Sequence, residues 1–489
     1  MLRSVRFGVV VVWAALLIAL ARSQMPPAAT PPADPAALPV AGDSAAAEDA
    51  WSGLYMQGHK VGYAHSRTAP RDGGYRLDET SVMRLRVLDS EQTIRAVIDA
   101  DTGADWAVRR FAVNLDTDLG AFDVRGSVAG DTLTLAMRSG GETTEQRVPI
   151  SEPIYLPSAA RAAAVARGLR EGATFTVRVF DPSALEHQPM TIRVLGRESL
   201  SVDGVAQPAW KLRESFRGIE STVWLDAAGK TLREEGPMGL VTVRESATQA
   251  MNEGWATAPF DLMAAVAVRP AQPISDPRQR DELRLRVGGL ESVAVPTDAR
   301  QTLHDGTLTV RREPGGAASY TLPYAGDQWR GELAATPFLQ IDHPSVQAAA
   351  GEALGDERDA RRAAERLRRW VYGALEKRPA ATIPNAVQVL QTRAGDCNEH
   401  AVLFAALARA AGLPARVVAG LVYADGVFLY HAWDEVWLGD GWVSVDAAFD
   451  QSPVDVTHIK LVEGGPEAHA ALVPVIGRLT LDVLPGEAG

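Results

Sequence analysis

The sequence has very little cysteine: Cys397 is the only one among 489 residues. A single cysteine cannot form an intramolecular disulfide, so disulfide bonding within the chain is excluded. Three roles remain open for it: a small buried hydrophobic residue, one half of a link to another molecule, or a reactive thiol. The count alone slightly favours the buried hydrophobic role.

Positive charge is also scarce. The chain has 49 lysines and arginines against 61 aspartates and glutamates, a net charge of −12, and no long basic run. Nucleic-acid binding calls for basic patches, so this balance argues against a nucleic-acid partner. The nine histidines lack the spacing of a metal-ligand cluster, and no Gly-x-Ser-x-Gly elbow occurs. We therefore predict neither a metal ion nor a cofactor.

Long hydrophobic runs are missing after the first residues. Residues 7–21 form an apolar stretch of 15 residues, preceded by Arg3 and Arg6 and ending in Ala-Leu-Ala. A membrane-spanning helix needs about 20 residues, so residues 1–21 are read as a cleaved secretory signal. The alternative is an uncleaved anchor that tethers the protein to the outer face of an inner membrane. Both interpretations predict a periplasmic or secreted protein.

The rest of the chain divides into four regions of different character. Residues 22–50 are rich in proline and alanine and are predicted to be a linker. Residues 51–250 alternate apolar and polar side chains, which predicts a mostly antiparallel β region with one helix over 158–172. Residues 251–342 are predicted to be a second, smaller β segment or an extension. Residues 343–489 begin with helical spacing and continue as a β meander, so the chain is a multidomain α+β protein.

Cys397 stands at the start of a predicted helix. Asp396 can cap that helix, which continues through alanine-rich sequence and stops at Gly412, with Pro414 close behind. The backbone N–H groups and the dipole of a helix start favour an anion. This position predicts a thiol that ionises readily and a place for an oxyanion beside it.

A histidine and an aspartate follow on the meander. If Gly439 and Asp440 form a two-residue turn, Trp433 pairs with Asp446, and His431 lies diagonally from Asp446 on the same face. An imidazole and a carboxylate can span that separation. Cys397 is then the candidate nucleophile, His431 the candidate base, and Asp446 the group that orients the imidazole.

Three segments carry a resemblance to a known family. GDCNEHAVLFAALARAAGLPAR, HAWDEVWL and GWVSVDAAF stand in the order typical of the transglutaminase-like superfamily. The resemblance covers residues 343–489 and implies a papain-like α+β domain with Cys397, His431 and Asp446 as its triad. Two departures are small. Ala447 and Ala448 stand where the family often has proline and threonine, and Asn398 replaces a common threonine or serine.

The resemblance implies an exported enzyme that cleaves or transfers an amide or peptide acyl group through a thioester on Cys397. Bacterial members are more often suspected hydrolases than proven crosslinkers, so we favour hydrolysis by a protease or amidase over transfer to an amine. We expect a protein or peptide substrate. Some animal members use calcium, but no calcium loop occurs in this sequence. The alternative is a non-catalytic periplasmic binding or scaffold protein. The sequence indicates neither the oligomeric state nor the role of the N-terminal β region.

Overall fold

The computed structural model describes most of the chain from Glu48 to Leu484. The described residues are 48–484 without 72, 88–89, 118–119, 140–141, 182–185, 203, 217–218, 253, 255–259, 292, 315–318, 379–383 and 466–467. The predicted signal or anchor over 1–21 lies outside them, as do linker residues 22–47. The described chain divides into two compact units, an N-terminal unit up to Leu262 and a C-terminal unit from Met263. The boundaries predicted at 251 and 343 stay predictions.

The N-terminal unit is built on one large sheet, which confirms the predicted mostly antiparallel β region. Its strands run in the order β8 to β1 and then β14 to β9, each antiparallel to its neighbours, while the short β15 pairs in parallel with β3. The strands are β1 (Glu48–Met56), β2 (His59–Arg71), β3 (Gly74–Val87), β4 (Ser90–Gly103), β5 (Val108–Thr117), β6 (Gly120–Ala129), β7 (Thr132–Ser139), β8 (Glu142–Pro149), β9 (Thr174–Asp181), β10 (Glu186–Val202), β11 (Val205–Phe216), β12 (Ile219–Leu225), β13 (Thr231–Glu235), β14 (Leu240–Glu245) and β15 (Phe260–Asp261).

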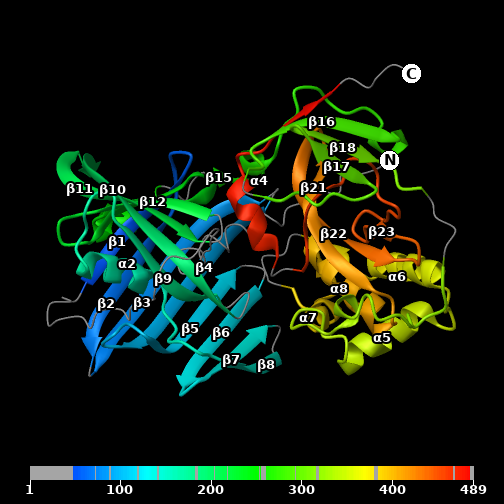
Figure 1. Ribbon diagram of the computed structural model, residues 1–489, viewed down its shortest axis with the longest axis horizontal. Helices are drawn as coiled ribbons and strands as arrows, with labels where there is room; N and C mark the ends of the chain where they lie inside the picture. The colour runs from blue at the N-terminus through cyan, green and yellow to red at the C-terminus, as the bar shows by residue number, and fades with distance from the viewer. Residues whose placement is uncertain are drawn as a thin grey trace. The chain divides into compact units, whose positions relative to one another are not determined.

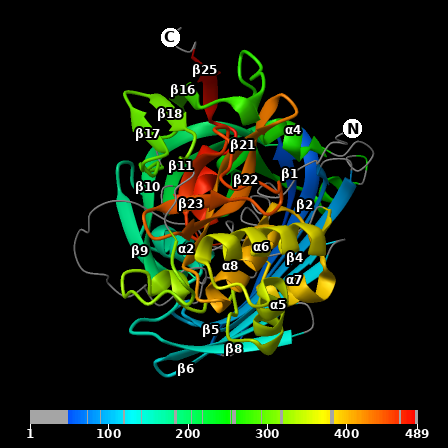
Figure 2. The same cartoon turned by 90° about the vertical axis from the view of Figure 1, so that its right-hand side faces the viewer.

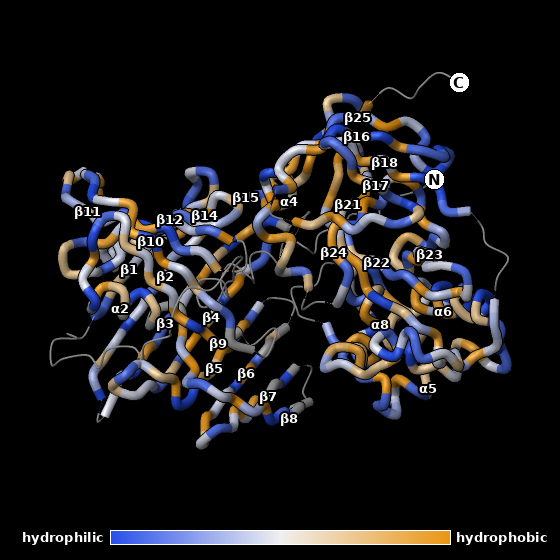
Figure 3. Tube along the Cα trace, viewed as in Figure 1, coloured by the Kyte–Doolittle hydropathy of each residue, from blue (hydrophilic) through white to orange (hydrophobic). Residues whose placement is uncertain are grey.

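Alternating hydropathy explains these strands, because successive side chains of a strand point to opposite faces. Figure 3 shows hydrophobic and hydrophilic residues alternating along many of them. On β7, Leu133 and Leu135 are fully buried, and they belong to an apolar cluster with Val113 and Ile154. The predicted helix is α2 (Pro157–Ala166), which ends before residue 172 because Gly168 adopts a left-handed conformation with φ 84°. A second short helix, α3 (Ala247–Ala250), follows β14.

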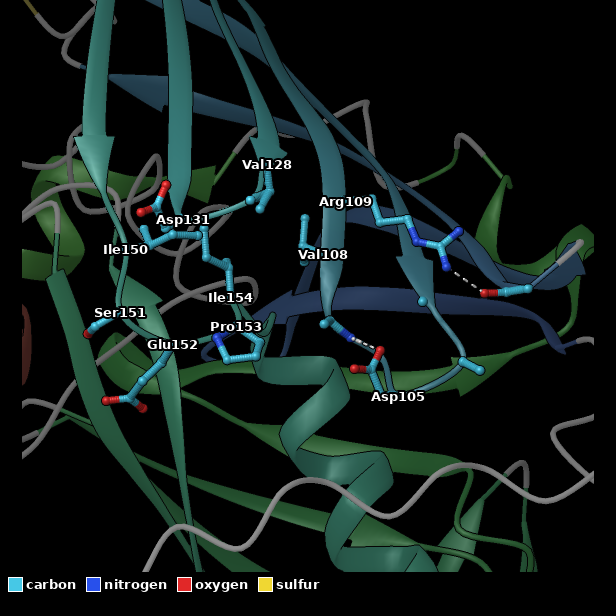
Figure 4. A pocket seen from close by; sticks show the side chains of 15 residues that line it. Asp105, Val108, Arg109, Val128, Asp131, Ile150, Ser151, Glu152, Pro153 and Ile154 are labelled. Carbon is cyan, nitrogen blue, oxygen red and sulfur yellow. Dashed lines mark hydrogen bonds between the residues drawn. The ribbon is translucent and has the colours of Figure 1, made fainter.

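A cavity of about 670 Å³ lies at one end of the large sheet. Its lining includes Asp105, Asp131 and Glu152 (Figure 4). Asp105 accepts the N–H of Ala107 at 3.1 Å, and Arg109 donates to the carbonyl oxygen of Gly73 at 2.9 Å. These polar contacts are internal to the protein, and none of the predicted site residues lines the cavity.

The C-terminal unit contains two four-stranded sheets (Figure 1). The first has the order β17–β18–β16–β25 and comprises β16 (Glu282–Gly288), β17 (Gln301–His304), β18 (Thr307–Arg311) and β25 (Thr480–Val483). The segment predicted as a smaller β region over 251–342 therefore shares a sheet with the end of the chain. The second sheet has the order β23–β22–β21–β24 and comprises β21 (Ala415–Ala424), β22 (Val427–Trp437), β23 (Trp442–Val445) and β24 (Ile459–Glu463).

Four helices gather on one side of the second sheet (Figures 1 and 2). They are α5 (Pro344–Leu354), α6 (Ala360–Ala374), α7 (Ala386–Thr392) and α8 (Cys397–Ala410). The short α4 (Leu262–Val266) lies at the division between the units, and β19 (Glu376–Lys377) pairs in parallel with β20 (Ala394–Gly395). Alanines along α8 allow neighbouring helices to pack closely, and the central helix is buried from Cys397 to Ala408. This arrangement is α+β, and the papain-like core stays an expectation from the resemblance.

No helix among the described residues is long and apolar enough to cross a membrane.

Candidate active site

The start of α8 is fixed by a reciprocal cap. The side chain of Asp396 accepts the N–H of Asn398 at 3.1 Å, and its own backbone N–H donates to Glu399 at 2.9 Å. A Cβ on Gly395 would lie 2.3 Å from the Cβ of Glu399, so a larger residue does not fit before the cap. As predicted, Cys397 is the first helical residue. The cap thus sets the position and direction of the thiol.

Cys397 is buried with 1% of its surface exposed. Its sulfur accepts a hydrogen bond from the backbone N–H of Ala432, the residue that follows His431 on β22. Burial raises the pKa of the thiol well above its ordinary value, and the charge of Asp396 adds to this effect, while the Ala432 N–H opposes it. The expectation of a readily ionised thiol is therefore wrong for this buried state, because desolvation outweighs the helix start.

The turn between β22 and β23 has the predicted register. The Leu438 N–H donates to the Gly441 carbonyl oxygen at 3.0 Å, and Asp434 pairs with Val445. This places Asp446 directly after the strand and across from His431. The Nε2 atom of His431 lies 2.7 Å from Oδ2 of Asp446, and both side chains are fully buried.

Hydrogen bonds from the backbone hold Asp446 as a carboxylate. Its Oδ1 atom accepts the N–H groups of Ala448 at 2.7 Å and Phe449 at 2.9 Å. Burial alone would raise the pKa of this carboxyl, but the two histidines bonded to it, His431 and His458, hold it well below its usual range. Asp446 is therefore charged at neutral pH.

His431 is the neutral partner of this pair. Burial lowers its pKa, although Asp446 opposes that effect. Because the ionised Asp446 can only accept a hydrogen bond, Nε2 carries the hydrogen and Nδ1 is the basic atom. The resting site thus holds a neutral thiol and a neutral imidazole whose tautomer suits proton acceptance.

His458 also bonds the carboxylate and was missed by the sequence analysis. Its Nε2 atom lies 3.1 Å from Oδ2 of Asp446, and its Nδ1 atom lies 3.4 Å from Oδ1 of Asp455. The only sequence signal is the spacing Asp-x-x-His just before β24. Strand pairing could not reveal it, since His458 reaches Asp446 from a loop rather than from a neighbouring strand position.

The first sheet of the unit supports this loop. Arg300 donates to the carbonyl oxygens of His458 and Asp455, each at 2.5 Å. Glu313 accepts the backbone N–H of Ser444, two residues before Asp446, at 3.0 Å. Two residues from the segment before residue 342 therefore hold the backbone near Asp446. Arg300 holds the loop that carries His458, and Glu313 holds the strand that leads into Asp446.

His431, Asp446 and His458 offer ligand atoms within 4.8 Å of one another. Such a set has the chemistry of a metal site, but their hydrogen bonds to one another already use these atoms. The three side chains therefore form a hydrogen-bonded cluster of one carboxylate and two imidazoles. Calcium, which prefers several oxygen ligands, does not suit a set dominated by ring nitrogens.

Two further buried polar residues lie near the site. The Nδ1 atom of His400 donates to the Asp396 carbonyl oxygen at 2.5 Å, and burial lowers the pKa of His400 to about 4. Both carboxyl oxygens of Asp434 are without a hydrogen-bond partner among the described residues. Burial raises the pKa of Asp434 well above its ordinary value.

Comparison with known proteins gives a family for this region. Residues 347–447 match the model described as "Transglutaminase-like superfamily". A "Protein-glutamine gamma-glutamyltransferase" of Pseudomonas aeruginosa is 38% identical over 93 residues, 16% of this chain and 14% of the relative. The chain thus spans only a small part of that relative's length.

Two solved structures are also similar in part. A candidate cysteine protease from Cytophaga hutchinsonii is 16% identical, with 46% of this chain and 90% of that chain covered and a TM-score of 0.29. A β-barrel-like protein from Brucella abortus is 11% identical, with 41% and 98% covered and a TM-score of 0.31. TM-scores this low support no conclusion about either unit.

Proposed function

Because residues 347–447 form a domain of the transglutaminase-like superfamily, we propose that this protein is a cysteine enzyme acting on amide or peptide bonds. Cys397 is the proposed nucleophile, with His431 as the base and Asp446 as its orienting carboxylate. The observation that carries this proposal is the 2.7 Å bond between His431 and Asp446, formed beside the strand residue whose N–H reaches the Cys397 sulfur.

The neutral resting pair favours general-base catalysis. Nδ1 of His431 takes the thiol proton as the sulfur attacks the carbonyl carbon, and the carbonyl becomes an oxyanion. Backbone N–H groups at the start of α8 are suited to stabilise that oxyanion. His431 then returns the proton to the departing amine, which leaves a thioester on Cys397.

A second acceptor completes the reaction. Water adds to the thioester while His431 takes one of its protons, and the proton passes to the sulfur as the carboxylic acid leaves. We place this hydrolysis ahead of amine transfer, following the resemblance of the sequence. The name of the Pseudomonas relative favours amine transfer, which is the second candidate. We also propose that residues 1–21 direct export, so that the enzyme acts on a protein or peptide in the periplasm or outside the cell.

The proposal is tested with a small activated ester, p-nitrophenyl acetate, which does not require the natural substrate. Intact-mass measurement should find an acetyl group on Cys397 in the native protein and none in Cys397→Ser. His431→Gln should acylate more slowly by about 100-fold, the usual size of a general-base contribution. Addition of a primary amine then separates the candidates, because hydrolysis yields acetate while transfer yields the acetylated amine.

Equal acylation of the native protein and Cys397→Ser would refute a cysteine enzyme. The non-catalytic scaffold would then be the better interpretation, provided that both proteins keep the same circular dichroism spectrum.

A further inference from the structure

His458 lies outside the residues that match the family model, yet it bonds the same carboxylate oxygen as His431. We propose that His458 is a positioning residue of the active site, a second histidine that holds Asp446 in place and limits the basicity of His431. This inference rests on the proposed function, since it assigns His458 a role in the same proton transfer.

The two carboxylates around the ring indicate a doubly protonated imidazole. Nε2 faces Asp446 at 3.1 Å, and Nδ1 faces Asp455 at 3.4 Å. A neutral ring would turn one lone pair toward a carboxylate oxygen, which repels it. Asp455 is itself held as an acceptor, because Thr457 donates to Oδ1 from its hydroxyl at 2.6 Å and from its N–H at 2.9 Å. His458 therefore carries a positive charge, and its raised pKa agrees with this.

The backbone around His458 is built to keep it there. Arg300 bonds the carbonyl oxygen of His458 itself, and it is buried with 7% of its surface exposed. Gly420 pairs with His431 on one side and with Lys460 on the other. A Cβ on Gly420 would lie 1.8 Å from the carbonyl oxygen of Ile459, so only glycine allows β24 to approach this closely. His458 immediately precedes that strand.

The shared oxygen couples the two histidines. Oδ2 of Asp446 accepts hydrogen bonds from both rings. Because the oxygen is shared, it stabilises the protonated form of His431 less than it would without His458. The positive charge of His458 also repels a proton on His431 and thus favours its neutral, basic form. The charged or titratable groups acting on this cluster are Asp446, Asp455, His431, Arg300, Lys377, Arg368, His400, Asp434 and Cys397.

The first measurement needs no substitution. In protein labelled with ¹⁵N-histidine, the ring nitrogens of His458 should both carry protons at pH 7, while His431 should carry one on Nε2. The long-range ¹H–¹⁵N spectrum distinguishes these states by nitrogen shift. A neutral His458 at pH 7 would overturn the inference directly.

Two variants then separate charge from position. His458→Gln keeps an N–H that can face Asp446 but removes the charge, whereas His458→Leu removes both. We expect the His431 titration to move to higher pH in both variants. The plateau rate of Cys397 acylation should be retained in His458→Gln and fall about tenfold in His458→Leu, the effect of one charge-assisted hydrogen bond.

His469→Gln is the matched control, a buried histidine whose backbone contact is to Gly464. It should leave the His431 titration where it is in the native protein. An unchanged His431 titration in His458→Gln, or equal rate losses without a shift in both variants, would reduce His458 to a packing residue. If Cys397 is not acylated in the native protein, the proposed function fails, and the histidine titrations still decide the role of His458.

Discussion

The two units of this chain differ in how many ionisable side chains they bury. Among the described residues of the N-terminal unit, the buried groups that can carry charge are Asp123 and Glu214. Among the described residues of the C-terminal unit, buried ionisable side chains are more numerous and include His431, Asp446 and His458, each fully enclosed. Burying a charge is costly unless it is paired, so such a concentration is typical of a functional site.

The two units also differ in how far apart in the sequence the contacting residues lie. In the large sheet most strands pair with their neighbours in sequence, from β1 to β8 and from β9 to β14. In the C-terminal unit, Arg300 reaches across 158 residues to His458, and Glu313 reaches across 131 residues to Ser444. A sheet can be built from local pairing, whereas the candidate site needs several distant segments to meet.

Among the substitutions that test this comparison, Asp446→Asn should have the largest effect. The amide keeps the size of the side chain but can turn an N–H toward His431, which would disfavour the tautomer that is basic at Nδ1. We expect acylation of Cys397 to fall by about 1000-fold or more, as for other triads that lose this carboxylate. The measurement is the acylation rate with p-nitrophenyl acetate.

Asp425→Asn is the matched control for that change. Asp425 lies exposed in the turn between β21 and β22 with φ 50°, which asparagine also tolerates. This variant should acylate at the native rate. An equally slow Asp425→Asn would mean that the loss in Asp446→Asn does not report on the site.

The sequence predicts the local features of this site and misses the distant ones. Capping residues and helix signals place Cys397 at the start of α8, and a two-residue turn fixes the register that brings Asp446 to His431. His458 and Arg300 could not be found in this way, because His458 comes from a loop and Arg300 comes from the residue before β17 in the first sheet. The helix start also predicts a readily ionised thiol, while only the fold reveals how deeply Cys397 is buried.

In the N-terminal sheet, too, the sequence predicts local features but not distant contacts. Alternating residues predict its antiparallel strands, but not that β1 joins β14 and unites two series of strands in one sheet. In the first C-terminal sheet, β25 likewise pairs with β16, although the two strands lie far apart in the sequence. Local patterns specify which segments are strands, whereas their long-range partners depend on packing.

Asp434 extends the comparison to stability, because its buried carboxyl has no hydrogen-bond partner among the described residues. Asp434→Val should raise the free energy of unfolding by about 1–3 kcal/mol, since valine suits a position opposite Val445 and needs no hydrogen bond. Chemical denaturation of the two proteins measures this. A less stable valine variant would show that the carboxyl is usefully bonded.

The direction in which Asp434 makes stability depend on pH follows from its pKa shift. The pKa of Asp434 is raised in the fold, so the unfolded state loses its proton first as the pH rises. The native protein should therefore lose stability relative to Asp434→Asn as the pH rises above about 4, the ordinary value for this carboxyl. A stability difference that does not change between pH 4 and pH 7 would contradict a raised pKa of Asp434 in the fold.

The smallest effect on the candidate site is expected from the N-terminal unit. Arg161 on α2 bonds Glu214 at 2.7 Å and Glu234 at 3.2 Å. Arg161→Leu leaves Glu214 buried without this partner and should lower the free energy of unfolding by about 3 kcal/mol. It should leave the acylation rate of Cys397 unchanged. Arg147→Leu, which breaks an exposed pair with Glu145, should change stability by less than about 0.5 kcal/mol.

The most direct test of a neutral, assembled site is the pH dependence of Cys397 alkylation by iodoacetamide, in the native protein and in His431→Gln. Burial raises the pKa of the thiol and lowers that of His431. The native rate should therefore be slow at acidic pH and still be rising above pH 8.5, the ordinary pKa of cysteine, and it should be slower without His431. Fast alkylation at pH 6 would instead indicate a resting thiolate–imidazolium pair, and equal rates in the two proteins would show that His431 does not act on Cys397.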